Sequence, residues 1–215
     1  MLLPALSAAR ERARNANCIS KLKQYVLANT MYANDNKDYV TTYGLNTSKS
    51  GAFWTWFKEG VGYDKLVLGG YFGQTFAAYS DIKIQTKIAH FVCPSDSVNA
   101  DQQNVTGGTS YYALWVLFNG IGPIDRIDAS KIKARAIVGR DNPGAAIIGD
   151  CVPAQKTYYP ANWSELVNSQ AGNHPKLVNA GYLGGQVASK QIRNETDFAA
   201  APGSYMTGVD QIEYY

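Results

Sequence analysis

The chain has 215 residues, a formal net charge of +3 and 17% charged residues, so it can form one elaborated domain and has no strongly basic surface for nucleic acid. Its basic cluster between Arg10 and Arg14 is interrupted by Glu11, which favours a solvated helix face. Three cysteines without a CxxC spacing argue against a zinc knuckle, and two histidines without a recognisable hydrolase, protease or nucleotide motif argue against an enzyme.

The first 33 residues predict one long helix. They contain no glycine, their only proline is Pro4, and strong helix formers dominate, which gives a helix of roughly 50 Å at 1.5 Å per residue. Two sides of this helix are apolar. One side, in the first half, carries Leu2, Leu6, Ala9, Ala13 and Ala16. A different side, in the second half, carries Cys18, Ile19, Leu22, Tyr25, Val26, Asn29 and Ala33.

This pattern predicts two parts of the chain. Residues 1–35 are expected to form the helix, with a projecting first half and a second half packed on the head, because the second half carries core-sized side chains. Residues 36–215 are expected to form that globular head. The alternative is an ordinary N-terminal helix with a frayed first turn.

A family resemblance rests on segments in and just after this helix. They are Leu2–Leu6 (LLPAL), Ala9–Glu11 (ARE), Cys18, Leu22–Gln24 (LKQ), Tyr32 and the Asn/Asp-rich Asn34–Asp38. Together they resemble the N-terminal helix of type IV pilin-like proteins, specifically the type II secretion protein G-like pseudopilins of planctomycete and lentisphaera-type bacteria. Lys21 stands where that family has Asn. The resemblance implies an α+β pilin-like fold, in which the long helix packs on an antiparallel sheet with loop insertions.

The resemblance has implications for the membrane and for the cysteines. Family precursors begin with a basic leader and an apolar segment, which a prepilin peptidase cuts and methylates. This chain starts where that segment would end, so we expect a soluble ectodomain without its inner-membrane anchor. Family members carry Cys at the positions of Cys18 and Cys93, which implies a disulfide that pins the helix to the head. Free buried thiols are the alternative, and Cys151 is unpaired in either case.

The polar segment Asn34–Asp38 is expected to end the helix. Its alternating side-chain oxygens faintly resemble a calcium loop, but the glycine and the distal glutamate of an EF-hand are missing. Beyond it, Phe53–Gly60 and Tyr63–Leu68 are expected to be short helices in an aromatic-rich insertion. The insertion is expected to bury its rings as a satellite core, and the alternative is a platform that stacks on glycans.

The remaining apolar segments predict the sheet. The expected elements are strands at Lys87–Asp96, Thr109–Phe118 and Ala145–Asp150, with a short helix at Ser130–Val138 and a turn at Asn142–Gly144. In a strand, His90 and Cys93 would point to opposite faces, so Cys93 is not expected to be a catalytic thiol.

The C-terminal part carries a second family landmark. The family signature is a histidine, nine residues and then Asp-Gly; here His174 and Gly185 match it, whereas Gly184 replaces the aspartate. Leu177–Leu183 and Gln186–Ala188 predict a hairpin through the Gly-Gly turn. His174 is expected to be structural or loop-exposed rather than a ligand. In the tail, Asp197, Asp210 and Glu213 are calcium candidates by chemistry alone, because related pseudopilins bind calcium through a C-terminal loop.

The resemblance implies a structural function without catalytic or cofactor-binding residues. Subunits would polymerise through their N-terminal helices into an envelope fibre, together with other pseudopilins, a prepilin peptidase and secretion machinery. Without the apolar segment, the chain is expected to be monomeric. The alternative is a membrane-tethered cell-surface module that binds polysaccharide or another exported ligand through the aromatic insertion.

Overall fold

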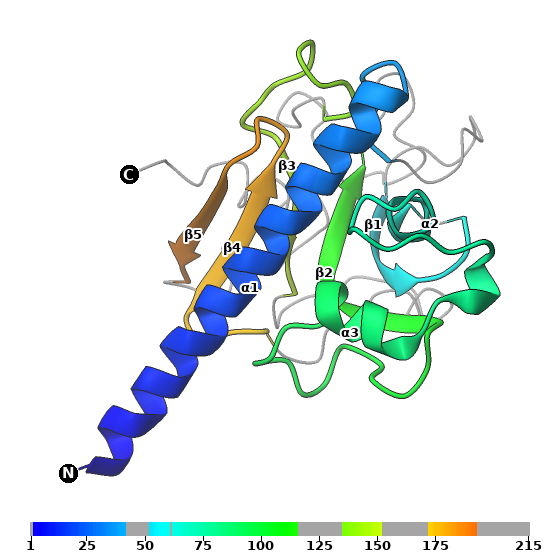
Figure 1. The fold of residues 1–215 in the computed structure, drawn as a ribbon. Coiled ribbons are helices and arrows are strands. Elements are labelled where there is room, and N and C mark those ends of the chain that lie inside the picture. Colours follow the sequence, from blue (N-terminus) through cyan, green and yellow to red (C-terminus); the bar gives the residue numbers. More distant parts are fainter. Residues whose placement is uncertain (1, 42–51, 61, 116–134, 152–171, 193–215) are drawn as a thin grey trace.

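A long helix lies across one face of a five-stranded antiparallel sheet (Figure 1). The computed structural model describes residues 2–41, 52–60, 62–115, 135–151 and 172–192. The helices are α1 (Leu2–Asp35), α2 (Tyr63–Leu68) and α3 (Ile84–Phe91), with a 3-10 turn, η1, at Tyr79–Asp81. The strands are β1 (Ala52–Phe57), β2 (Gly107–Trp115), β3 (Ala146–Asp150), β4 (Leu177–Tyr182) and β5 (Val187–Gln191). This is the α+β pilin-like architecture that the sequence predicted.

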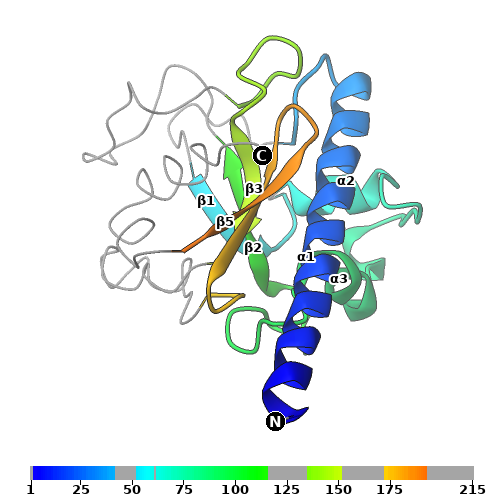
Figure 2. The same cartoon turned by 90° about the vertical axis from the view of Figure 1, so that its left-hand side faces the viewer.

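The sheet keeps the order of the chain. Its strands lie in the order β1-β2-β3-β4-β5, and each neighbouring pair is antiparallel. The helices α1, α2 and α3 lie on the same side of the sheet (Figure 2). Helix α1 contacts β3, β4 and β5, and α3 contacts β2 and α1. The core therefore lies between one sheet face and a layer of helices.

The two halves of α1 have different surroundings. Residues 4–10 are exposed on every side of the helix, so this end projects beyond the head (Figure 1). The second half buries one side against the sheet and α3, as expected from its core-sized side chains. The buried side chains are Cys18, Leu22, Tyr25, Val26, Ala28, Asn29 and Ala33. Ile19, expected on the same side, is half-buried.

A glycine sets how closely α1 approaches the sheet. Gly181 of β4 lies directly under α1 and pairs with Ile148 of β3. A Cβ atom at Gly181 would lie 2.5 Å from Cγ2 of Val26 and 2.9 Å from Cγ2 of Ile148, which is too close for ordinary contact. The helix therefore packs directly on the backbone of β4.

The polar segment after α1 stops the helix, as predicted. Lys37 and Asp38 have φ angles of 56° and 66°, which are left-handed and cannot continue an α-helix. The amide of Asp38 donates to the carbonyl oxygen of Ala33 at 2.9 Å, and the side-chain amide of Asn36 donates to the carbonyl oxygen of Tyr32 at 2.8 Å. These bonds satisfy carbonyl groups of the last turn.

Two predicted elements are wrong in type. Phe53–Gly60 was expected to be a helix, but its first part belongs to strand β1, whose residues pair with β2 about fifty residues away. The alternating aromatic and Thr side chains of this segment suit a pleated strand, and the non-local pairing decides the outcome. Lys87–Asp96 was expected to be a strand, but α3 occupies Ile84–Phe91. The spacing of Ile84, Ile88 and Phe91 is that of one helix face.

Two further predicted elements agree with the structure where it describes them, and a third does not. Tyr63–Leu68 is helix α2, and Thr109–Trp115 lies within β2, while residues 116–118 lie outside the described part of the chain. Residues 130–134 also lie outside it, and the rest of the predicted helix at Ser130–Val138 is not helical, because Ile137 forms a bridge with Tyr39.

The predicted C-terminal hairpin is present as β4 and β5. Gly185 in its turn has a φ angle of +97°, a conformation that favours glycine. Gly184, which replaces the family aspartate, lies against Pro143, and a Cβ at Gly184 would be 2.9 Å from the Cβ of that proline. Any larger side chain at position 184 therefore requires the turn at Pro143 to move.

Gly181→Ala tests the close approach of α1. We expect the free energy of unfolding to fall by about 1–3 kcal/mol, because the added methyl group meets Val26 and Ile148. Urea unfolding of the wild type, Gly181→Ala, Val26→Ala and the double variant measures the coupling. Shortening Val26 removes the clash, so the double variant is expected to be more stable than the sum of the single effects by more than about 0.5 kcal/mol. Strict additivity would contradict the contact.

Candidate functional site

The outward side of α1 carries the residues predicted for assembly. Four of these side chains are exposed, namely Leu6, Ala9, Ala13 and Ala16, and Leu6 is 50% exposed. Leu2 belongs to α1, but the structure does not describe its side chain. Two further apolar side chains continue this side along the second half, because Leu27 and Met31 are 61% and 44% exposed. The outward stripe is defined here as Leu6, Ala9, Ala13, Ala16, Leu27 and Met31. Ser20 lies on the same side of the helix between Ala16 and Leu27, so a polar residue interrupts the stripe.

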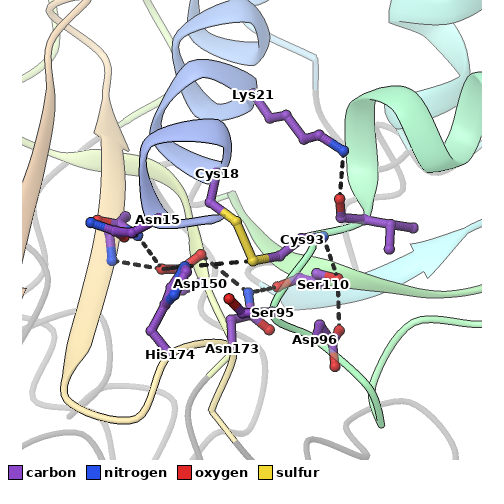
Figure 3. Close-up of a disulfide and its surroundings, with 12 residues drawn as sticks. Asn15, Cys18, Lys21, Cys93, Ser95, Asp96, Ser110, Asp150, Asn173 and His174 are labelled. Carbon is purple, nitrogen blue, oxygen red and sulfur yellow. Dashed lines mark hydrogen bonds and ion pairs between the residues drawn. A yellow bond between two sulfur atoms is a disulfide. The ribbon is translucent and has the colours of Figure 1, made fainter. Parts of the chain in front are cut away.

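A disulfide ties α1 to the head. Cys18 of α1 and Cys93, which follows α3, are bonded, with a Cα–Cα distance of 5.4 Å across 75 residues (Figure 3). This is the pairing that the family resemblance implied. In the chain-entropy model, closing a loop of this length raises the free energy of the unfolded chain by about 4 kcal/mol and so stabilises the folded protein. Cys151 is a buried free thiol.

His174 lies beside this disulfide rather than in an exposed loop. The side chain is buried, and its Nε2 atom lies 3.5 Å from Sγ of Cys93. On the other side of the ring, Nδ1 lies 2.7 Å from Oε1 of Glu11, which projects from the first half of α1. The hydroxyl of Ser95 donates to both carboxylate oxygens of Glu11, at 3.1 and 3.0 Å. Of the two expected roles, structural or loop-exposed, His174 therefore has the buried, structural one.

Asp150 completes this cluster from the end of β3. Its Oδ2 atom lies 3.8 Å from Nε2 of His174 and accepts hydrogen bonds from the backbone and side-chain amides of Asn179, at 2.8 and 2.7 Å. Its Oδ1 atom accepts a hydrogen bond from the side chain of Asn173 at 3.1 Å. Burial raises the pKa of Asp150 to about 6, although the charge of His174 and these amides act in the opposite direction. The disulfide–histidine cluster is defined here as Glu11, Cys18, Cys93, Asp150 and His174.

Asn179 carries this network back to α1. Its side-chain amide donates to Oδ1 of Asn15 at 2.8 Å as well as to Asp150 (Figure 3 shows Asn15 and Asp150 at one end of the cluster). The helix and strands β3 and β4 therefore share one buried set of hydrogen bonds. Because buried polar groups are costly when they lose a partner, this set fixes the rotation and height of α1 on the sheet.

Two more side chains hold the segment around Cys93. The backbone amide of Cys93 donates to Oγ of Ser110 at 2.8 Å, and Ser110 donates to Oδ2 of Asp96 at 2.6 Å. Asp96 also accepts the backbone amides of residues 98–100 and so closes the turn after Pro94. The disulfide thus ends on a turn whose polar groups are satisfied.

Lys21 joins α1 to the end of α3. Its Nζ atom donates to the carbonyl oxygens of Ile88 and Val92, at 2.8 and 2.6 Å. These are carbonyl groups that the last turn of α3 leaves without helical partners. Burial lowers the pKa of Lys21 to about 8. The lysine that departs from the family pattern therefore caps a helix of the head.

The described rings of the aromatic insertion pack inward. Phe57 and Tyr63 are fully buried, with ring centroids 6.4 Å apart, and the hydroxyl of Tyr63 donates to the carbonyl oxygen of Tyr111 at 2.8 Å. Tyr71, Phe72, Phe76 and Tyr79 are partly buried against the same core. The expected burial of these rings is confirmed, but they belong to the main core rather than to a satellite core. The side chains of Phe53, Trp54 and Trp56 lie outside the description.

The predicted calcium candidates cannot be placed. Asp197, Asp210 and Glu213 lie outside the described residues. Within the described ranges, one group of side chains brings three potential metal-ligand atoms within 4.8 Å of one another. It consists of Cys18, Cys93 and His174. Sequence reasoning named all three residues but did not bring His174 to the disulfide, and it missed Glu11 and Asp150 entirely.

Comparison with known proteins gives one match. Residues 7–186 match the family described as protein of unknown function (DUF1559). No curated protein and no solved structure matches the chain. Among the helices that the structure describes, none combines the length and the apolar character needed to cross a bilayer.

Asp150→Asn tests the electrostatics of the cluster. Because burial raises the pKa of Asp150 to about 6, the folded protein retains this proton between about pH 4 and pH 6, where the unfolded chain has lost it. The Asp150 carboxyl therefore makes the free energy of unfolding fall as the pH rises through that interval. At 1.36 kcal/mol per pH unit, the fall amounts to up to roughly 3 kcal/mol.

Urea unfolding of the disulfide-bonded wild type and of Asp150→Asn between pH 4 and pH 7 measures this contribution. The free energy of unfolding of Asp150→Asn is expected to rise relative to that of the wild type as the pH increases from 4 to 7. The reason is that the amide keeps the shape of the carboxyl without its charge. Parallel pH profiles would show that Asp150 ionises normally in the folded protein.

Proposed function

Because this chain belongs to the DUF1559 family, which is pilin-like, we propose that it is a structural subunit of an envelope fibre. Subunits would associate through the outward stripe of α1. The fibre would work with type II secretion or type IV pilus-like machinery, and its subunits would be processed by a prepilin peptidase. The heads would lie on the extracytoplasmic side of the inner membrane, anchored by an apolar segment that continues α1 toward its N-terminus.

The observation that carries this proposal is the division of α1 into two sides. One side of its second half is occupied by the head, through Cys18, Leu22 and Val26, so it is not available to another subunit. The outward stripe is exposed and apolar in two parts of the helix, from Leu6 to Ala16 and from Leu27 to Met31, with Ser20 between them. Exposed Leu27 and Met31 contribute little to folding, and such apolar surface typically marks contact with a partner.

The composition of the stripe suits contact between helices. Ala9, Ala13 and Ala16 are small, so a second helix can approach closely along the outward side of the first half of α1. Leu6, Leu27 and Met31 supply larger apolar contacts at either end. The stripe by itself is narrow, and the apolar anchor would supply most of the association in the membrane. We therefore propose that assembly requires an apolar anchor in addition to the outward stripe.

The ligand-binding alternative has less support. A surface module would present the rings of the aromatic insertion to solvent. Phe57 and Tyr63 are instead buried, and the four partly buried rings of this region pack against the core. We therefore do not propose polysaccharide binding through these side chains.

Cysteine cross-linking tests the proposed assembly face. The full-length gene product would be expressed with a prepilin peptidase, with Ala9→Cys and Ala16→Cys placed on the outward stripe. Arg14→Cys provides a matched control, since this position is also exposed in the first half of α1 but points about 100° away from Ala13. A thiol-specific bifunctional cross-linker is expected to give dimers, the product that one reactive cysteine per subunit allows, from each stripe position and little product from position 14.

Two results would contradict the proposal. Monomers at all three positions in the processed protein would mean that α1 only tethers the head. Equal dimer yields at Arg14→Cys and at the stripe positions would mean that the contacts are random collisions in the membrane rather than one assembly face. Electron microscopy of the same cells would show whether the cross-linked species form fibres.

A further inference from the structure

We propose that the reduced form of the disulfide–histidine cluster is a zinc site, with Cys18, Cys93 and His174 as ligands. These three side chains come from α1, from the segment after α3 and from the segment before β4, and all are buried. Their ligand atoms lie within 4.8 Å of one another. This inference does not depend on fibre assembly.

The separations of these atoms fit tetrahedral zinc. With Zn–N near 2.0–2.1 Å and Zn–S near 2.3 Å, the N–S edge of a tetrahedron is about 3.6 Å. Nε2 of His174 lies 3.5 Å from Sγ of Cys93. The two sulfur atoms are bonded in the oxidised protein, and in a zinc site they would stand about 3.8 Å apart. The Cα atoms of Cys18 and Cys93 are 5.4 Å apart, so rotation of the side chains can supply this separation.

The histidine is oriented as a metal ligand would be. Nδ1 of His174 faces the carboxylate of Glu11 at 2.7 Å, and a carboxylate can only accept a hydrogen bond. In the neutral ring the proton is therefore assigned to Nδ1, and the lone pair of Nε2 is then directed at Sγ of Cys93. Carboxylate–histidine pairs of this kind orient the histidine in zinc sites. Ser95 in turn holds Glu11 through both carboxylate oxygens.

Asp150 lies beside the imidazole, with its Oδ2 atom 3.8 Å from Nε2 of His174. It is not among the three residues whose ligand atoms lie within 4.8 Å of one another, so the site is assigned three protein ligands. The carboxyl is fully buried, and its hydrogen-bond partners include the neutral amides of Asn173 and Asn179. A divalent cation would compensate this buried charge better than amides do. Glu11 is on the far side of the imidazole and so would support the site from outside.

The donor set selects the metal. Two thiolates and one imidazole in a tetrahedral arrangement favour Zn²⁺ over Ca²⁺ or Mg²⁺, which prefer oxygen ligands. The absence of a CxxC motif does not argue against such a site, since its ligands lie at positions 18, 93 and 174 and meet only in the fold.

The chemistry requires prior reduction. A dithiol gives two electrons and two protons to the Cys18–Cys93 bond and becomes a disulfide itself, which leaves one thiol on each cysteine. Zn²⁺ then displaces both thiol protons and binds the thiolates. Zinc would thereby replace the disulfide as the link between α1 and the head whenever the chain is reduced.

Cobalt binding to the whole chain tests this site. The protein would be purified with its disulfide intact, reduced anaerobically with a water-soluble phosphine and titrated with Co²⁺. We expect one Co²⁺ per chain, with cobalt–thiolate charge-transfer absorption and the d–d bands of tetrahedral Co²⁺, both displaced by one equivalent of Zn²⁺. The oxidised protein is expected to show neither. If reduction unfolds the chain, Zn²⁺ is expected to restore its helical circular dichroism.

The chain offers matched controls for each ligand type. His174→Ala is expected to lose the tetrahedral spectrum, whereas His90→Ala, at the second histidine of the chain, is expected to keep it. Cys151→Ala removes the third cysteine, and this variant is also expected to keep the tetrahedral spectrum. Glu11→Gln is expected to weaken Co²⁺ binding by roughly 10- to 100-fold through the orientation of His174. Each variant can be checked for its fold in the oxidised state before reduction.

Two results would overturn the proposal. The first is the absence of a stoichiometric cobalt–thiolate spectrum in the reduced wild type, whether that chain is folded or unfolded. The second is an undiminished spectrum in His174→Ala, which would mean that the thiolates bind cobalt without the buried histidine.

Discussion

The close contact between the second half of α1 and strand β4 is the constraint on which the rest of the structure depends. Gly181 lets Val26 lie directly on the strand, and the disulfide at Cys18 holds the same half of the helix eight residues earlier. Since α1 is a continuous helix, fixing its second half also fixes the direction of its first half. The projecting end and the outward stripe are thus consequences of how the head holds the helix.

The polar groups under the helix add specificity to this apolar contact. Asn15, Asp150 and Asn179 connect α1 to β3 and β4 through hydrogen bonds that only one rotation of the helix satisfies. Such a network contributes little net stability, because its groups lose water when they are buried. Asp150 illustrates this cost, since its burial raises its pKa toward neutrality. The network is better understood as a device that selects one position of α1, while the disulfide and the apolar core stabilise that position.

The general fold and the main link between helix and head could be predicted from the sequence, whereas the cluster around that link could not. The long helix followed from local composition, and the hairpin followed from Gly184 and Gly185, because both depend on neighbouring residues. The strand at Ala52–Phe57 was missed because it pairs with residues far away in the chain. Helix α3 was missed because its β-branched and aromatic residues suggested a strand, although the spacing of Ile84, Ile88 and Phe91 was helical.

The site shows the same limit more sharply. Cys18 and Cys93 were paired only through the family resemblance, and His174 was named without a neighbour. Glu11 is separated from His174 by 163 residues, so no local pattern could connect them. Asp96 and Asp150 stood at the ends of apolar segments, which is a signal for a turn or a buried carboxyl but does not indicate its partners. Their roles follow from the packing of α1 on the sheet.

Hydrogen exchange along α1 tests the central claim most directly, namely that its second half is locked to the head while its first turns stand free. In the disulfide-bonded protein, amides from Cys18 to Ala33 are expected to exchange as slowly as those of β3 and β4. Amides of residues 5–10 are expected to exchange far faster, because the residues at this end of the helix are exposed. Equal protection along the whole helix, or rapid exchange between Cys18 and Ala33, would contradict the account.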